Sequence, residues 1–260
     1  MITSTRNERV QAVRRLHRRS AREAERRFVV EGPQAVREAL ASLQELYAVD
    51  LDDPLARQAA AQGVEVVHVD GKVLAALAET VTPQGLVGVA PLLDGELPAA
   101  PRLVAVLHEV TDPGNAGTVI RTADAAGADA VVLTAGSVDP HNGKCVRASA
   151  GSLWHLPVVR EADVQETIAG LQSRGLQVLA TTGSSDVELD EADLSAPTAW
   201  LFGTEAHGLP DQVLAAADVR VRIPLYGRAE SLNLAAAAAV CLYASARGQR
   251  RGPTVSPWTA

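Results

Sequence analysis

Residues 223–240 read IPLYGRAESLNLAAAAAV, a strand end and a polar loop that lead into an alanine-rich run. The run predicts a buried helix over about residues 231–247, because alanine has the highest helix propensity. Glu230, Ser231 and Asn233 crowd the entrance of that helix with a carboxylate, a hydroxyl and an amide. Ser231 or Asn233 alone would be enough to cap the first turn. The surplus of polar groups therefore indicates a binding site at the helix entrance.

Upstream of this stretch, apolar segments alternate with helical ones from residue 103 onward. Continuous apolar runs are typical of strands that are buried on both faces of a parallel sheet. We therefore expect an α/β domain with a mostly parallel sheet and helices on both faces. The expected strands are 103–107, 130–134, 156–159, 176–182, 198–203 and 219–224.

A smaller α/β unit comes before this domain. Residues 7–27 have helical spacing, and the prolines and charges of residues 91–101 are typical of a linker. We therefore expect two domains, one over residues 1–95 and one over residues 96–260. The expected strands of the smaller domain are 27–32, 46–50, 65–70 and 85–90.

The charges are unevenly distributed along the chain. Residues 1–27 hold nine arginines and three glutamates, a net charge of +6, whereas the whole chain carries −7. Arginine outnumbers lysine 22 to 2, and the planar guanidinium group suits phosphate. The net charge argues mildly against a nucleic-acid partner, but this asymmetry is typical of a basic arm on an acidic body, which favours one. A solvated helix face explains the same charges equally well.

The composition indicates the cellular compartment in which the protein is expected. Two cysteines do not make a disulfide framework, and they suit a reducing compartment. The N-terminal segment has no apolar core of a secretory signal, and the apolar run 234–244 is too short to span a bilayer. We therefore expect a cytoplasmic protein that does not enter a membrane. The six histidines show no metal-ligand spacing, so no metal site is expected.

Two further loops are rich in glycine and polar residues where expected strands end, which is where ligands bind in open α/β sheets. The first, 112–127, reads DPGNAGTVIRTADAAG, in which Asn115 can cap a helix and Arg121 lies further in. It is neither a dinucleotide fingerprint nor a P-loop, and by itself it favours a capped helix with an exposed arginine. The second, 201–210, reads LFGTEAHGLP, with glycines on either side of Glu205. Such glycines allow a ligand to approach the backbone closely.

Taken in order, the three loops resemble the three motifs of the SpoU family, also called the TrmH family, of RNA ribose 2′-O-methyltransferases in the SPOUT superfamily. The resemblance covers residues 103–247, and residues 7–90 resemble the small RNA-binding domain that many members carry. It implies a C-terminal domain with a deep trefoil knot, one of the rare exceptions to unknotted chains. It also implies S-adenosylmethionine as the cofactor and a homodimer formed through the C-terminal domain.

The resemblance assigns residues to the cofactor and to the RNA. The expected cofactor-binding residues are Thr181, Thr182, Gly183, Phe202, Gly203, Glu205, Gly208, Ile223, Pro224, Leu232 and Asn233. The expected RNA-binding residues are Arg9, Arg14, Arg15, Arg18, Arg19 and Arg147.

The resemblance also implies a catalytic set made of Asn115, Arg121, Glu205, Ser231 and Asn233. A guanidinium group is hardly ever deprotonated in proteins, so Arg121 is expected to hold a phosphate and stabilise alkoxide charge rather than act as a base. Asn115 and Ser231 would position Arg121 or the ribose. Glu205 would orient Arg121 or accept the proton, and Asn233 would shape the loop.

The expected reaction is methyl transfer from S-adenosylmethionine to a ribose 2′-hydroxyl of structured RNA. Large-subunit ribosomal RNA is the first candidate and transfer RNA the second. One alternative is a catalytically inactive RNA-binding protein of ribosome assembly on the same fold. Another is a nucleotide-dependent oxidoreductase on a doubly wound fold, which the absence of the G-x-G-x-x-G fingerprint disfavours.

Overall fold

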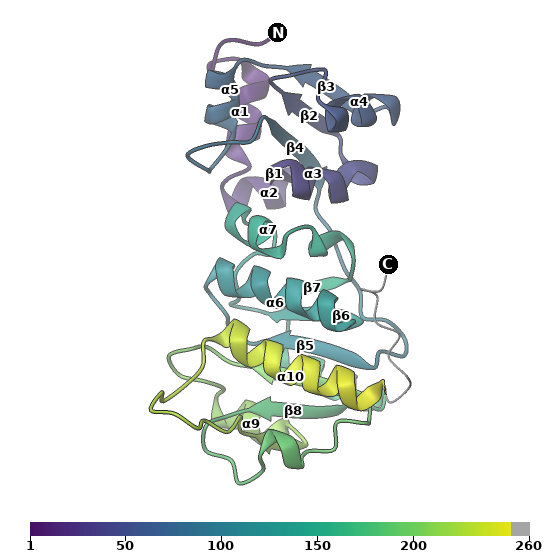
Figure 1. Ribbon diagram of the computed structural model, residues 1–260, viewed down its shortest axis with the longest axis vertical. Coiled ribbons are helices and arrows are strands. Elements are labelled where there is room, and N and C mark those ends of the chain that lie inside the picture. The colour runs from purple at the N-terminus through teal and green to yellow at the C-terminus, as the bar shows by residue number, and fades with distance from the viewer. Residues whose placement is uncertain (251–260) are drawn as a thin grey trace. The chain divides into compact units, whose positions relative to one another are not determined.

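The computed structural model describes residues 1–250, which group into two compact units (Figure 1). The first unit contains residues 1–94, 112–121 and 139–155. The second unit contains residues 95–111, 122–138 and the described residues from 156 onward. Two short segments that follow residue 94 in the sequence, 112–121 and 139–155, therefore belong to the first unit. No helix among residues 1–250 is both long enough and apolar enough to cross a membrane.

The first unit is built on a four-stranded sheet in the order β1-β4-β2-β3. Strand β4 runs antiparallel to both β1 and β2, and β2 runs parallel to β3. Its strands are β1 (Arg27–Glu31), β2 (Glu45–Ala48), β3 (Glu65–His68) and β4 (Leu86–Pro91). Its helices are α1 (Glu8–Arg15), α2 (Arg19–Glu25), α3 (Pro33–Ala39), η1 (Leu40–Ser42), α4 (Pro54–Ala61), α5 (Gly71–Leu77), α7 (Gly143–Ser149) and η2 (Ser152–Trp154).

The second unit is built on a six-stranded sheet in the order β10-β8-β9-β5-β6-β7, in which every neighbouring pair is parallel. Its strands are β5 (Leu103–Leu107), β6 (Ala130–Thr134), β7 (Val158–Ala162), β8 (Gln177–Thr181), β9 (Thr198–Phe202) and β10 (Val219–Val221). Its helices are α8 (Val164–Ser173), η3 (Leu189–Glu191), α9 (Asp211–Ala216) and α10 (Leu234–Gln249). Helix α6 (Pro113–Ala126) begins in the first unit and ends in the second. The parallel α/β sheet predicted from the continuous apolar runs is confirmed.

The alanine-rich helix packs directly on the middle of this sheet. Helix α10 contacts β5 and β9, every residue of which is buried (Figure 1). Small side chains at positions such as Ala238 let the helix approach the strands closely, as the alanine-rich run suggested. One buried polar contact fixes its position, because the indole Nε1 of Trp200 donates to Ser245 Oγ at 2.9 Å.

Two helix boundaries differ from those expected. The helix expected over residues 7–27 is two helices, because the chain turns after Leu16 and Arg18 is extended. The guanidinium of Arg22 donates to the carbonyls of Leu16 and His17, which the end of α1 leaves without helical partners. The final helix begins at Leu234 rather than near residue 231, because Asn233 is its cap.

The cap of α6 was also assigned to the wrong residue. Asn115 was expected to cap this helix, but α6 begins at Pro113 and Asn115 lies in its first turn. The cap is the side chain of Asp112, whose Oδ1 accepts the backbone N–H of Asn115 at 2.7 Å. Lys144 donates to the same carboxylate, and these contacts lower the pKa of Asp112 below its usual value.

Arg22, which belongs to the basic N-terminal run, is buried in the first unit. It donates through Nε to Asp139 Oδ2 at 2.7 Å, and both side chains are less than 5% exposed. His141 donates to Asp139 through its backbone N–H and through Nδ1, because its Nε2 accepts the N–H of Leu93. Burial raises the pKa of Asp139, but the His141 hydrogen bonds and the Arg22 charge outweigh it and hold that pKa well below its usual range. Arg22 is therefore an internal support rather than an RNA contact.

Replacing Asp139 with Asn should lower the free energy of unfolding by about 3 kcal/mol, because it leaves the Arg22 cation buried without its counter-ion. Denaturant unfolding at pH 7 measures the change. Asp52→Asn, which breaks the exposed pair with Arg57, should leave stability unchanged.

Because the pKa of Asp139 is lower in the folded protein than in the unfolded chain, the contribution of Asp139 to stability is present above about pH 4 and declines as pH falls toward the folded-state pKa. An Asp139→Asn protein as stable as the wild type would contradict this account.

Candidate active site at the carboxyl ends of the strands

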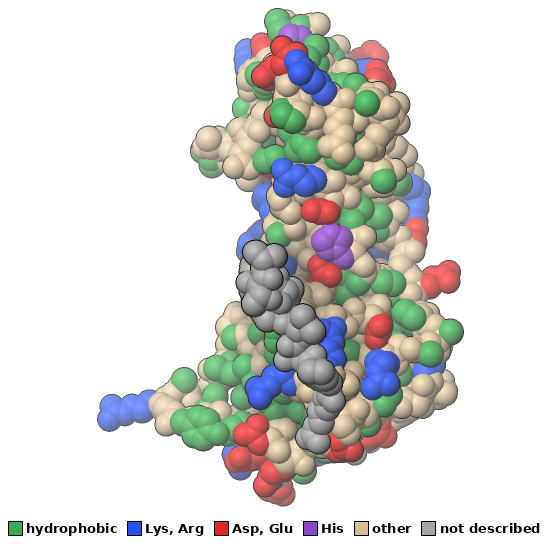
Figure 2. All heavy atoms as spheres, turned by 45° about the vertical axis from the view of Figure 1, so that its right-hand side comes forward, with side chains coloured by type: hydrophobic (Ala, Val, Ile, Leu, Met, Phe, Trp, Pro, Cys, Tyr) green, Lys and Arg blue, Asp and Glu red, His purple; other side chains and the backbone are tan. Residues whose placement is uncertain are grey.

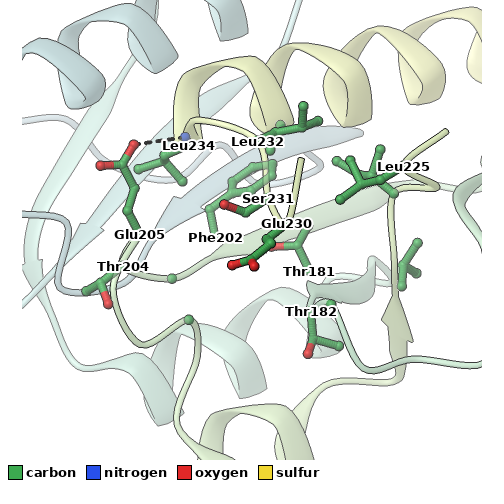
Figure 3. Close-up of a pocket in the computed structure, with 16 residues that line it drawn as sticks. Thr181, Thr182, Phe202, Thr204, Glu205, Leu225, Glu230, Ser231, Leu232 and Leu234 are labelled. Carbon is green, nitrogen blue, oxygen red and sulfur yellow. Dashed lines mark hydrogen bonds between the residues drawn. The ribbon is translucent and has the colours of Figure 1, made fainter. Parts of the chain in front are cut away.

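A cavity of about 220 Å³ opens where three neighbouring strands of the second unit end. Parallel pairing aligns these ends, since Thr181 of β8 lies opposite Val221 of β10, and Ala180 lies opposite Leu201 of β9. The lining comes from the segment after β8, the loop after β9 and the segment that joins β10 to α10 (Figure 3). The loop after β9 and the segment before α10 therefore meet at the entrance of α10, where the polar surplus in the sequence indicated a binding site.

The loop after β9 is a tight turn closed by its own backbone. Thr204 and Gly208 exchange two backbone hydrogen bonds, at 3.2 and 2.9 Å. Gly208 has a φ of +65°, a conformation that favours glycine. A Cβ on Gly203 would lie 2.2 Å from the carbonyl oxygen of Gly208, so a side chain cannot fit there. The two glycines thus fix a compact loop that carries Glu205 on its outer side.

Glu205 ties this loop to the start of α10. Its Oε1 accepts the side-chain N–H of Asn233 at 2.7 Å. The same oxygen accepts the backbone N–H of Leu234 at 3.2 Å, the bond dashed in Figure 3. The other end of the Asn233 amide, Oδ1, accepts the backbone N–H groups of Ala235 and Ala236. A carboxylate near a helix N-terminus is stabilised by the helix dipole as well as by these bonds. Glu205 and Asn233 together therefore cap α10 and hold the cavity wall in place.

The cavity itself combines apolar walls with a few polar side chains. Phe202, Leu225 and Leu232 contribute apolar surface, and Glu230 and Ser231 contribute a carboxylate and a hydroxyl (Figure 3). Within residues 1–250 neither of these two polar side chains makes a hydrogen bond or an ion pair. Mostly apolar lining with a few polar groups available to a ligand is the usual composition of a small-molecule site.

Most residues predicted to bind a cofactor lie together in this lining. Pro224 and Asn233 do not line it, although Asn233 caps the helix beside it. Residues that sequence reasoning missed include Thr204, Leu225, Leu234 and Ala237; their only signal was adjacency to the motifs. The predicted residues in the lining are Thr181, Thr182, Gly183, Phe202, Gly203, Glu205, Gly208, Ile223, Leu232 and, from the predicted catalytic set, Ser231.

Two members of the predicted catalytic set lie on α6 instead. Asn115 is in its first turn, and Arg121 is exposed two turns further along. The guanidinium of Arg121 makes no hydrogen bond or ion pair within residues 1–250, so it is available to a ligand.

The arginines predicted to bind RNA fall into two groups. Arg9 is held by Glu65 and Glu45, which raise its pKa above the ordinary value, and Arg147 is held by Glu31 and Glu79. These two guanidinium groups have carboxylate partners within the first unit. The exposed group on α1, α2 and the turn between them consists of Arg14, Arg15, Arg18 and Arg19, of which Arg15 also pairs with Glu25 at 3.8 Å.

A parallel α/β sheet with a partly apolar, partly polar cavity at its strand ends defines a protein that binds a small ligand there. The sequence model of the SpoU rRNA Methylase family matches residues 102–243, which include the sheet and the cavity. A second model, the MRM3-like substrate binding domain, matches residues 7–88. The chain belongs to the SpoU rRNA Methylase family, and the expected resemblance is confirmed.

Known relatives match over nearly the whole chain. The 23S rRNA (guanosine(2553)-2′-O)-methyltransferase RlmP of Bacillus subtilis is 36% identical, over 93% of this chain and 97% of its own. The solved AdoMet-bound rRNA methyltransferase of Sinorhizobium meliloti is 35% identical, with a TM-score of 0.85 over 95% of this chain and 96% of its own. The SpoU methyltransferase AviRb of Streptomyces viridochromogenes, solved with AdoMet, is 28% identical, with a TM-score of 0.85 over 95% of this chain and 100% of its own.

Replacing Gly203 with Ala should weaken S-adenosylmethionine binding by at least about tenfold, because the added Cβ collides with the Gly208 backbone and forces the loop open. Gly227→Ala is the matched control, since a Cβ there meets nothing within 4 Å. Isothermal titration calorimetry measures both dissociation constants. Equal affinities in the two variants would show that the turn after β9 does not shape the binding site.

Proposed function

We propose that the protein transfers a methyl group from S-adenosylmethionine to the ribose 2′-oxygen of a guanosine in large-subunit ribosomal RNA. The observation that carries this proposal is the cavity at the ends of β8, β9 and β10, formed by two of the three family motifs. The names of the relatives support guanosine in 23S rRNA as the substrate class. Transfer RNA is the second candidate substrate.

The lining suits S-adenosylmethionine. Leu225 and Leu232 offer exposed apolar surface to an adenosine group, and the buried Phe202 supports the lining. The Glu230 carboxylate puts negative charge in a cavity whose ligand carries sulfonium and ammonium charges. When bound, S-adenosylmethionine supplies an electrophilic methyl group on its sulfonium. The lining residues orient that group, and in-line placement provides much of the acceleration.

Arg121 is assigned to the RNA side of the reaction. Its guanidinium stays protonated, so the 2′-hydroxyl loses its proton to solvent water rather than to Arg121 as the methyl group leaves the sulfonium. It can hold the adjacent phosphate and stabilise negative charge as it develops on the 2′-oxygen. Its exposed position, without an internal partner in residues 1–250, supports this role. Asn115 and Ser231 are assigned to positioning Arg121 or the ribose.

Glu205 and Asn233 are assigned to shaping the site. Both side chains are engaged at the start of α10, and Glu205 Oε1 already accepts two hydrogen bonds. These contacts favour the loop-shaping role over proton acceptance by Glu205.

The first unit is assigned to RNA binding. The exposed Arg14, Arg15, Arg18 and Arg19 can neutralise phosphates, and the family match over residues 7–88 supports a substrate-binding role. We also propose a domain boundary near residue 95, a cytoplasmic location, and the trefoil knot that the family resemblance implies.

The proposal includes a homodimer formed through α10. The outward face of this helix carries no charge from Ala236 to Ala244, and Val240 and Tyr243 are more than 40% exposed on it. Further exposed apolar side chains, Leu225 and Tyr226, lie in the segment that joins β10 to α10. Figure 2 shows hydrophobic side chains gathered on the projection at its lower left. Apolar side chains gathered in this way are typical of an interface with another chain.

Replacing Arg121 with Ala should lower kcat for methyl transfer by about a hundredfold or more, while the dissociation constant for S-adenosylmethionine stays the same. Transfer of labelled methyl to unmodified large-subunit RNA measures the first, and calorimetry the second. Arg57→Ala removes an equally exposed arginine on α4 and should leave both values unchanged. Full activity of Arg121→Ala would refute the catalytic assignment. A wild-type protein that binds the cofactor but labels no RNA would favour the catalytically inactive, RNA-binding alternative.

Replacing Val240 and Tyr243 together with Asp should convert the dimer into a monomer, because four charges would face one another across a symmetric interface. Sedimentation velocity measures the oligomeric state. Leu51→Asp, at an exposed leucine of the first unit, is the control and should remain dimeric. A monomeric wild-type protein would contradict the proposed dimer.

A further inference from the structure

A second cavity, of about 300 Å³, lies entirely within the first unit and has no part in the cofactor site. It is lined by residues from the end of β1, the start of α3, the segment between α5 and β4, and α7. The residues that matter for its chemistry are Glu31, Gln34, Thr80, Thr82, Gln84 and Arg147. Its volume is at the lower end of the range for small-ligand sites, so it suits a single compact group.

Glu31 makes this cavity rigid. Its side chain is buried, and its two oxygens accept the backbone N–H groups of Glu79 and Thr80, the hydroxyl of Thr80 and the guanidinium of Arg147. The Glu31 carboxylate therefore fixes the position of the first two residues of the segment 79–84. A ligand would meet a preformed wall, which reduces the entropy that binding costs.

The segment 79–84 presents two exposed polar side chains to the cavity, those of Thr82 and Gln84. Within residues 1–250, neither the amide of Gln84 nor the hydroxyl of Thr82 makes a hydrogen bond. An amide offers both donors and an acceptor, and a hydroxyl offers one donor and acceptor lone pairs. Together they can read the edge of a planar ligand that carries donors and acceptors.

Val81 lies in the sequence between Thr80 and Thr82, which both line the cavity; it does not line the cavity itself, and it is 100% exposed. Glu31 holds the two residues before Val81 by hydrogen bonds to their backbone N–H groups. The backbone at Val81 is therefore fixed, and the valine side chain stays exposed to solvent. An apolar side chain held in this way gains most when a partner covers it. The flat face of an aromatic ring is a suitable cover.

The charges around the cavity argue against a phosphate as the ligand. Glu31 and Glu79 contribute two negative charges, and the single positive charge of Arg147 is paired with both. A neutral ring with polar edges avoids this repulsion. Sequence-specific proteins recognise RNA mainly through unpaired bases, which offer such edges and faces.

We propose that this cavity binds one unpaired nucleobase of the RNA substrate, with Gln84 and Thr82 contacting the edge of the base and Val81, next to the lining residues Thr80 and Thr82, covering the part of the base that extends beyond the cavity. The inference rests on the proposed function, because it takes RNA as the substrate. It assigns to the first unit a base-specific contact in addition to the phosphate contacts of its arginines.

The first test compares Val81→Ser and Gln84→Ala with Leu51→Ser, which changes an exposed leucine elsewhere in the first unit. Each of the first two variants should raise KM for RNA by about five- to tenfold, the usual size for the loss of one apolar or hydrogen-bonded contact. Their kcat and their affinity for S-adenosylmethionine should match the wild type. Leu51→Ser should match it in every value.

The second test places a photoreactive benzoylphenylalanine at position 81 and maps the crosslinked nucleotide by primer extension. A crosslink to one unpaired nucleotide is expected. If wild-type protein methylates the RNA but both variants keep its KM, or the crosslinks are spread over paired regions, this inference alone is overturned. If wild-type protein neither binds nor methylates the RNA, the proposed function fails, and this inference fails with it.

Discussion

The carboxylate of Glu205 accepts the backbone N–H of Leu234 and the side-chain N–H of Asn233, and the arrangement of the cofactor site depends on this contact. It joins the glycine-bounded turn after β9 to the first residues of α10. Helix α10 is in turn fixed on the sheet by its small side chains and by the hydrogen bond from Trp200 to Ser245. The walls of the cavity are thus set by a helix end and a tight turn that hold each other in place.

The local features of the sequence were enough to predict the sheet and most of the residues that line the cavity at its strand ends. Continuous apolar runs identified the parallel strands, and polar residues after those runs identified where the cavity would be. The sequence could not show which polar groups the fold itself uses. Asn233 was part of the polar surplus at the helix entrance and Glu205 belonged to the loop 201–210, yet both are engaged in capping α10. Glu230 and Ser231, in the same stretch, are the ones left available to a ligand.

The sequence pattern could not predict contacts between segments that are far apart in the chain. Arg22 and Asp139 are 117 positions apart, and Arg22 looked like one more arginine of a basic arm. Its burial also explains why one expected helix is two, since its guanidinium satisfies carbonyls at the end of α1. The cavity beside Glu31 likewise needs Arg147, from a segment that joins the first unit only in three dimensions. Periodicity and propensity describe neighbours along the chain, so such pairs remain invisible to them.

The two cavities differ in the chemistry they offer, which is consistent with a division of labour between cofactor and RNA. The central claim is that the protein methylates a ribose oxygen of guanosine in large-subunit RNA. The most direct measurement is mass spectrometry of nucleosides released from that RNA after incubation with the protein and S-adenosylmethionine. The account predicts that 2′-O-methylguanosine accumulates. Methyl groups found on a base, or no new methylated nucleoside despite cofactor binding, would contradict it.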